Sequence, residues 1–273
     1  MPRSNLADAF QPGQKLTFGC HDFLNSKPIL YPLLQGVIPA PFDMVLDSPA
    51  RLADRLKEGE LDLAFIPAVE YARINRLRIV PGFSIAATGE VKTVLLYSRK
   101  NLEEIKTVAV DQRSRTSVSL LKVLMHGFYK QKVSFNISAG GDPLAVADAA
   151  LVIGDEAFKI HRKKFHVYDL SEEWFKFTGK PFVFSILCAA PGVEADVAVE
   201  ALRRARGAGR ILLDDIVASG AELAGISQAQ CHDYLRNRIQ YDLTPAHVEG
   251  LKLFLELAFQ YGVTPANPPL VFY

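Results

Sequence analysis

The chain has 273 residues, of which 49% are hydrophobic and 22% are charged, and its formal net charge is +1 at pH 7. This composition is typical of a globular protein with a large core, and it argues against a bulk partner such as nucleic acid or a charged membrane surface. Three scattered cysteines, Cys20, Cys188 and Cys231, argue against a disulfide framework or a zinc site.

The N-terminal segment, residues 1–14, is polar and has no apolar run, so we expect no secretory signal there. No stretch of the chain approaches the roughly 20 apolar residues that a membrane span needs. We therefore expect a cytoplasmic protein without a membrane partner.

Short apolar runs alternate with helical patterns up to about residue 190. We predict strands at residues 15–20, 43–46, 61–66, 77–80, 91–97, 107–110, 134–137, 150–153, 167–170 and 182–189. Ser48-Pro49 marks a helix start, because a hydroxyl cap is followed by proline in the first helical position. Pro81-Gly82 is expected to end the strand at 77–80.

The stretch from Val110 to Ser117 joins a buried strand to an amphipathic helix. Ser114 or Thr116 is a natural N-cap of this helix. Free N–H groups at a helix N-terminus suit a carboxylate or a phosphate. An ordinary cap without any ligand explains the same residues, so both interpretations stay open at this point.

Beyond residue 190 only helical patterns remain, at residues 193–219, 227–239 and 245–261. Strands that alternate with helices predict an α/β chain with mainly parallel sheets. We expect two lobes, one formed by residues 1–98 and 187–273 and the other by residues 99–186, with a ligand between them at the ends of strands. A single doubly wound domain with a helical tail is the alternative.

The spacing of polar residues limits the possible chemistry. The six histidines are scattered, which predicts no metal site, and neither a glycine-rich nucleotide loop nor a Gly-x-Ser-x-Gly elbow is present. His21 and Asp22 could pair as a base and its orienting acid, but neighbours on an extended chain face opposite sides, which favours a surface position. Asn25 and Ser26 either stabilise a tight turn or face the cleft.

Six stretches, taken in order, carry a resemblance to a known family. They are FLNSKP (23–28), GELDLAFIP (59–67), GEVKTV (89–94), SRTSV (114–118), LVIGDEA (151–157) and GKPFVF (179–184). Together they cover most of residues 15–190 and resemble the MqnA family, the chorismate dehydratases of the futalosine route to menaquinone.

The resemblance implies a two-lobed fold similar to type II periplasmic binding proteins, with mixed sheets flanked by helices and a ligand cleft between the lobes. It implies a lyase that removes water from chorismate to give 3-[(1-carboxyvinyl)oxy]benzoate. The implied partner is this small-molecule substrate, and no cofactor is implied.

The resemblance also assigns residues to the site. Asn25 and Thr93 match the catalytic pair, and Ser114, Thr116 and Ser117 match residues that bind a substrate carboxylate. Thr93 stands where the family usually has serine; the hydroxyl is kept, and the added methyl group restricts its rotamers. Because Asn25 is not basic at neutral pH, we expect it to orient the substrate while a substrate carboxylate takes the proton.

We further expect Ser26, Arg115 and Asp155 to contact the substrate, since they lie in the same strand-ending loops. Three other functions stay open: a non-catalytic protein that binds a small carboxylate, the effector-binding domain of a regulator, and a related enzyme for another cyclic carboxylate. The fold alone does not separate them.

Overall fold

The computed structural model describes residues 15–111, 114–138 and 141–273. Residues 1–14, for which we expect no signal sequence, lie outside the described residues. Within the described ranges, no helix is both long and apolar enough to cross a membrane.

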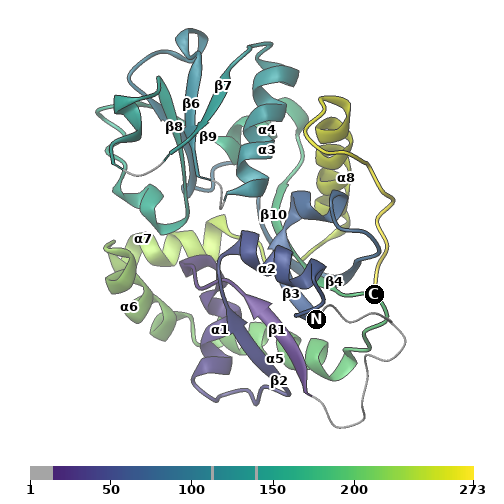
Figure 1. Cartoon of the computed structure of the whole chain (residues 1–273). Coiled ribbons are helices and arrows are strands. Elements are labelled where there is room, and N and C mark those ends of the chain that lie inside the picture. Colours follow the sequence, from purple (N-terminus) through teal and green to yellow (C-terminus); the bar gives the residue numbers. More distant parts are fainter. Residues whose placement is uncertain (1–14, 112–113, 139–140) are drawn as a thin grey trace.

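Two five-stranded sheets form the centre of the molecule (Figure 1). The strands of the first sheet are β1 (Leu16–Cys20), β2 (Phe42–Leu46), β3 (Leu63–Pro67), β4 (Arg78–Ala87) and β10 (Phe182–Ala189), in the order β2-β1-β3-β10-β4. Those of the second are β5 (Val94–Ser98), β6 (Thr107–Val110), β7 (Ser134–Ile137), β8 (Ala149–Ile153) and β9 (His166–Asp169), in the order β7-β6-β8-β5-β9.

Both sheets mix parallel and antiparallel pairs in the same way. β1 is parallel to β2 and β3, and β6 is parallel to β7 and β8. β10 and β5 are antiparallel to both of their neighbours. Each is the first strand after a crossing: the chain passes from the first sheet into β5 and returns from the second sheet into β10. The two-lobed fold with mixed sheets is confirmed. The expectation of mainly parallel sheets is wrong, as is the single doubly wound domain.

The chain crosses between the sheets earlier than the apolar pattern indicated. Residues Val94–Ser98 pair with β8 and β9, so they belong to the second sheet. The return crossing precedes β10, which lies wholly in the first sheet. We propose lobe boundaries within residues 88–93 and 179–181, in place of 98 and 187.

Strand β4 runs through Pro81 and Gly82, where we expected it to end. It lies at the edge of the first sheet, so the missing N–H of proline breaks no ladder there. Gly82 adopts a φ of 82°, a conformation that favours glycine.

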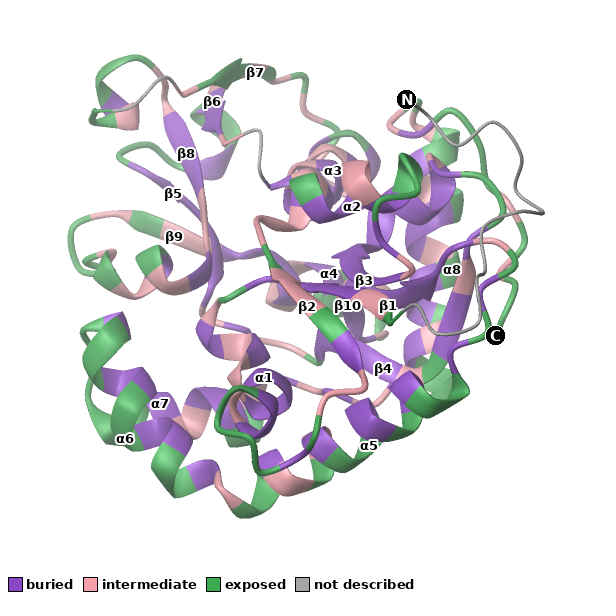
Figure 2. Ribbon diagram, turned by 60° about the horizontal axis from the view of Figure 1, so that its bottom comes forward, coloured by how far each residue is buried: buried purple, intermediate pink, exposed green. Residues whose placement is uncertain are grey.

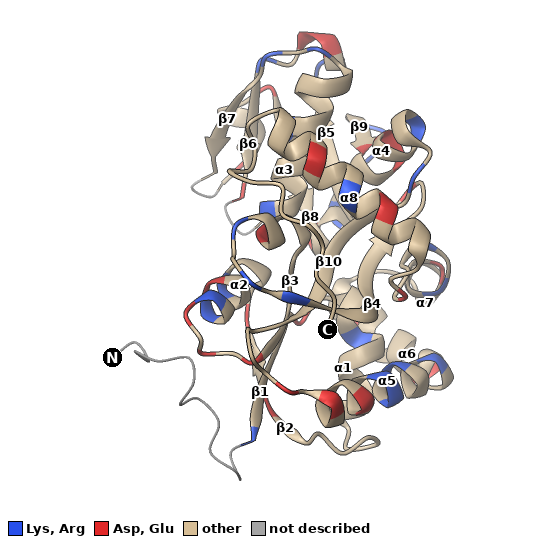
Figure 3. Ribbon diagram, turned by 90° about the vertical axis from the view of Figure 1, so that its right-hand side faces the viewer, with Lys and Arg blue, Asp and Glu red and all other residues tan. Residues whose placement is uncertain are grey.

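Helices cover the sheets, and their outer faces are exposed (Figure 2). They are α1 (Lys27–Leu34), α2 (Pro49–Lys57), α3 (Arg115–Val123), α4 (Leu170–Thr178), α5 (Asp196–Ile211), α6 (Leu213–Ala224), α7 (Gln228–Asp233) and α8 (Pro245–Gln260). The single helix expected at 193–219 is therefore two helices, α5 and α6, and both contact α1. Helix α8, which carries charges of both signs (Figure 3), contacts β10 and α3.

Gly209 allows α5 to touch the backbone of α1. A Cβ atom at Gly209 would lie 1.8 Å from the carbonyl oxygen of Pro28, whereas one at Gly207, in the same helix, would meet nothing within 4 Å. Pro28 follows Asn25 by three positions in the chain, so this close approach helps to place the loop that carries Asn25.

We predict that Gly209→Ala lowers the free energy of unfolding by about 3 kcal/mol, because α1 must move to admit the methyl group. Gly207→Ala is the matched control and should raise it by about 0.5–1 kcal/mol, since alanine favours the helix. Urea unfolding measures both. Equal effects of the two substitutions would contradict the close contact.

Candidate functional site

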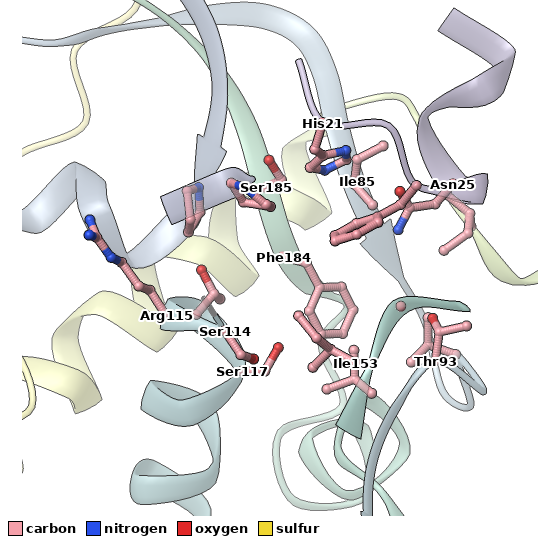
Figure 4. Close-up of a pocket in the computed structure, with 18 residues that line it drawn as sticks. His21, Asn25, Ile85, Thr93, Ser114, Arg115, Ser117, Ile153, Phe184 and Ser185 are labelled. Atoms are coloured by element: carbon pink, nitrogen blue, oxygen red, sulfur yellow. The ribbon is translucent and has the colours of Figure 1, made fainter. Parts of the chain in front are cut away.

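A cavity lies between the two sheets (Figure 4). Its walls combine apolar side chains with a few polar ones, as small-molecule sites do. The lining contains His21, Phe23, Asn25, Pro49, Pro67, Ile85, Val91, Thr93, Val94, Ser114, Arg115, Thr116, Ser117, Ile153, Gly154, Phe184, Ser185 and Ile239. The structure thus brings both members of the predicted catalytic pair to the same cavity as the start of α3.

One wall is the N-terminus of α3. Ser114 is the N-cap residue, but its side chain caps no N–H group. Its Oγ atom is buried and has no hydrogen-bond partner within the part of the chain that the structure describes. Thr116 and Ser117 add two buried hydroxyls, and Thr116 Oγ1 accepts a hydrogen bond from the N–H of Val69 at 3.3 Å. The hydroxyl of Ser114 and the helix N-terminus are therefore suited to an anionic ligand.

The guanidinium group of Arg115 forms ion pairs between the two lobes. Its guanidinium donates to Asp54 at 2.7 and 2.9 Å and to Glu70 at 3.1 Å, and these carboxylates, Asp54 first, raise its pKa although burial opposes them. In Figure 4 the guanidinium points away from the other labelled side chains. Arg115 therefore joins the two lobes and also lines the cavity, and its contact with the substrate stays a prediction.

Thr93 and Asn25 lie across the cavity from Ser114 and Ser117 (Figure 4). Thr93 is buried and directly precedes β5. Its Oγ1 atom is 2.9 Å from the hydroxyl of Tyr234, which belongs to the π-helical turn η7 (Tyr234–Arg238). Asn25 lies in the 3-10 helix η1 (Leu24–Ser26), so the two residues reach the site from different lobes.

His21 lines the cavity, although its sequence neighbours favoured a surface position. It is only 4% exposed, because the chain turns inward where β1 ends at Cys20. Its Nδ1 atom hydrogen-bonds to the hydroxyl of Ser26. Burial lowers the pKa of His21 to about 4, so the ring is neutral at neutral pH. Ser26 holds this ring and is not among the residues that line the cavity, and its contact with the substrate stays a prediction.

Asp155 also lies outside the lining of this cavity. It belongs to the 3-10 helix η6 (Gly154–Lys159), and its carboxylate accepts the N–H of Leu24 at 3.3 and 3.4 Å. Burial raises its pKa, while this hydrogen bond opposes the shift. Asp155 therefore holds the turn that carries Asn25, from the opposite lobe. It lines an adjacent pocket that shares His21 and Phe23 with the cavity, and its contact with the substrate stays a prediction. Among the described residues, no cluster of His, Cys, Asp or Glu could hold a metal ion.

Two further features of the site were not predicted from the sequence. Tyr234 is 141 residues from Thr93, and no local pattern joins them. Phe184 and Ser185 lie in an apolar strand whose pattern predicts only burial, but both line the cavity.

The described residues form the fold of periplasmic binding proteins, with a cavity between the two lobes. A protein of Archaeoglobus fulgidus of known structure aligns with a TM-score of 0.79 at 15% identity, covering 93% of this chain and 100% of that one. The alkanesulfonate-binding protein of Xanthomonas axonopodis pv. citri aligns with a TM-score of 0.64 at 15% identity, covering 95% and 96%. A Candida albicans protein with the generic periplasmic binding protein fold aligns with a TM-score of 0.66 at 12% identity, covering 93% of this chain and 92% of that one.

The family model for menaquinone biosynthesis matches residues 16–260, and the chain belongs to this family. The chorismate dehydratase of Thermus thermophilus is 30% identical over 227 residues, which cover 76% of this chain and 83% of that protein. The resemblance found in the six stretches is thereby confirmed.

We predict that His21 makes the stability of the protein depend on pH. The unfolded chain binds the imidazole proton near pH 6.5, but the folded protein binds it only near pH 4, so the unfolded state is favoured as the pH falls. Relative to His21→Asn, which does not titrate, the wild type should lose up to about 3 kcal/mol of unfolding free energy across this window. Urea unfolding at several pH values measures it, and a difference that stays constant with pH would contradict the buried neutral ring.

Proposed function

We propose that this protein is a chorismate dehydratase, a lyase that converts chorismate to 3-[(1-carboxyvinyl)oxy]benzoate for menaquinone biosynthesis. Membership of the menaquinone biosynthesis family and the similarity to the Thermus thermophilus enzyme support this function. The observation that carries it is the gathering of Asn25, Thr93 and the start of α3 around one cavity.

The N-terminus of α3 is proposed to bind a carboxylate of chorismate. Chorismate has two carboxylates, and the hydroxyls of Ser114, Thr116 and Ser117 surround a helix N-terminus with its partial positive charge. Because Arg115 is paired with two carboxylates, this anion is held by neutral donors. Apolar residues such as Phe184 provide contact area for the ring.

The reaction needs one proton acceptor and a departing hydroxide. The ring carbon that bears the enolpyruvyl ether loses its proton, the neighbouring carbon loses its hydroxyl group as hydroxide, and the proton and hydroxide together make one water. The electron pair of the broken C–H bond becomes the new ring double bond, and the ring becomes aromatic. No carboxylate lines the described part of the cavity, so we propose that a carboxylate of the substrate takes the proton.

Asn25 and Thr93 are proposed to orient the substrate and to hydrogen-bond its departing hydroxyl group. Asn25 has no basic group, and the hydroxyl of Thr93 is a donor and acceptor rather than a base at neutral pH. Holding the substrate carboxylate beside the ring proton makes the proton transfer intramolecular. Such positioning contributes up to roughly 7–11 kcal/mol in the best cases.

Contacts between the lobes are proposed to limit the access of water to this reaction. Arg115 and Asp155 each reach across from the second lobe, to Glu70 and to the N–H of Leu24 respectively. Exclusion of water strengthens the hydrogen bonds that hold a charged substrate. We also propose a cytoplasmic location, since the three cysteines are buried and free, as is usual in a reducing compartment.

We predict that the purified protein converts chorismate to a product lighter by one water, with an aromatic ring and an intact enolpyruvyl group. Mass spectrometry and ultraviolet absorption follow the product, and a sample without protein is the control. Chorismate that is bound, as shown by calorimetry, but recovered unchanged would favour the non-catalytic carboxylate-binding protein instead.

We predict that Asn25→Ala and Thr93→Val each lower kcat by about 100-fold, because the departing hydroxyl group loses its partner. Thr93→Ser, which keeps the hydroxyl, should retain most of the activity. Steady-state kinetics with chorismate measure kcat and KM separately. A wild-type kcat for Thr93→Val would remove this hydroxyl from the reaction.

A further inference from the structure

Tyr234 forms a hydrogen bond behind the proposed catalytic pair. Its side chain is fully buried, and its hydroxyl is 2.9 Å from Oγ1 of Thr93. Burial raises the pKa of Tyr234 well above its usual value, and the hydrogen bond with Thr93 partly opposes the shift. The phenol therefore stays protonated and has the Thr93 hydroxyl as its hydrogen-bonding partner.

Tyr234 meets Thr93 from a part of the chain that lies far away in sequence. Its hydroxyl can donate one hydrogen bond and accept others, and the hydroxyl of Thr93 can do the same. Thr93 precedes the first strand of the second sheet, while Tyr234 comes from a later segment, after α7. Tyr234 therefore holds the Thr93 hydroxyl from the C-terminal part of the chain.

The ring of Tyr234 is held independently of its hydroxyl. Phe158 packs edge-on against it, with ring centroids 5.2 Å apart. The adjacent residue, Asp233, forms an ion pair with Lys92 at 2.9 Å, which joins the same two segments. Removal of the hydroxyl alone should thus leave the ring and both segments in place.

We infer that Tyr234 is a positioning residue that fixes the hydroxyl of Thr93 in the orientation used for dehydration. This role rests on the proposed function of the cavity. It gives the C-terminal third of the chain a direct part in the site, through a residue that does not itself line the cavity. Without the phenol, the side chain of Thr93 gains rotational freedom, and fewer molecules hold the productive geometry.

The test is Tyr234→Phe, with Tyr241→Phe as the matched control. Tyr241 is also a buried tyrosine of this segment, but its hydroxyl has no hydrogen-bond partner among the residues described, and it is absent from the cavity lining. We expect Tyr234→Phe to lower kcat for chorismate by about 10- to 100-fold with KM changed less than about threefold. Tyr241→Phe should keep kcat within about twofold. Circular dichroism and melting curves should show both variants folded.

A double-mutant cycle with Thr93→Val distinguishes positioning from a general structural effect. If Tyr234 acts through Thr93, the double variant loses much less activity than the product of the two single losses. The role of Tyr234 would be overturned if the activity losses of the two single variants multiply in the double variant, or if Tyr234→Phe keeps the wild-type kcat. In both cases, conversion of chorismate by the wild-type protein would still support the dehydratase function. A wild-type protein that does not convert chorismate would overturn the proposed function and this role together.

Discussion

The ion pairs of Arg115 with Asp54 and Glu70 join the two lobes beside the cavity, and the site depends on this junction. Glu70 is buried and also pairs with Arg73, so its charge is compensated on two sides. Removing one partner of such a buried pair leaves an uncompensated charge, which is strongly unfavourable. The hydrogen bond from Leu24 to Asp155 makes a second junction nearby. Neither lobe contains the whole site, so these contacts assemble it.

Because the charge of Arg115 is paired between the lobes, the lining of the cavity is close to neutral. The described lining contains only two ionisable side chains: Arg115, whose guanidinium is paired elsewhere, and His21, which burial keeps uncharged at neutral pH. A neutral lining suits a reaction whose substrate brings its own carboxylates and whose product is aromatic. The protein then supplies donors, orientation and exclusion of water rather than a strong base.

The helices beyond the second sheet complete the site from behind. Tyr234 follows α7, and Ile239, five residues later, lines the cavity itself. Helix α8 packs against β10 and α3, the elements that carry Phe184 and the proposed carboxylate site. The periplasmic-binding-protein fold thus uses its C-terminal segment both to cover the first lobe and to support residues of the cavity.

Local patterns in the sequence determined most strands, the alternation of strands with helices, and the order of motifs that marks the family. The same motifs located Asn25, Thr93 and the hydroxyls of α3, because each lies within a short stretch whose residues act together. The tertiary structure alone decided that His21 is buried, that Arg115 turns to Asp54 and Glu70, and that Asp155 holds Leu24 from 131 residues away. It alone placed Tyr234 against Thr93. These features depend on contacts between lobes, and side-chain periodicity reports only which face of an element is buried, not which distant residue meets it.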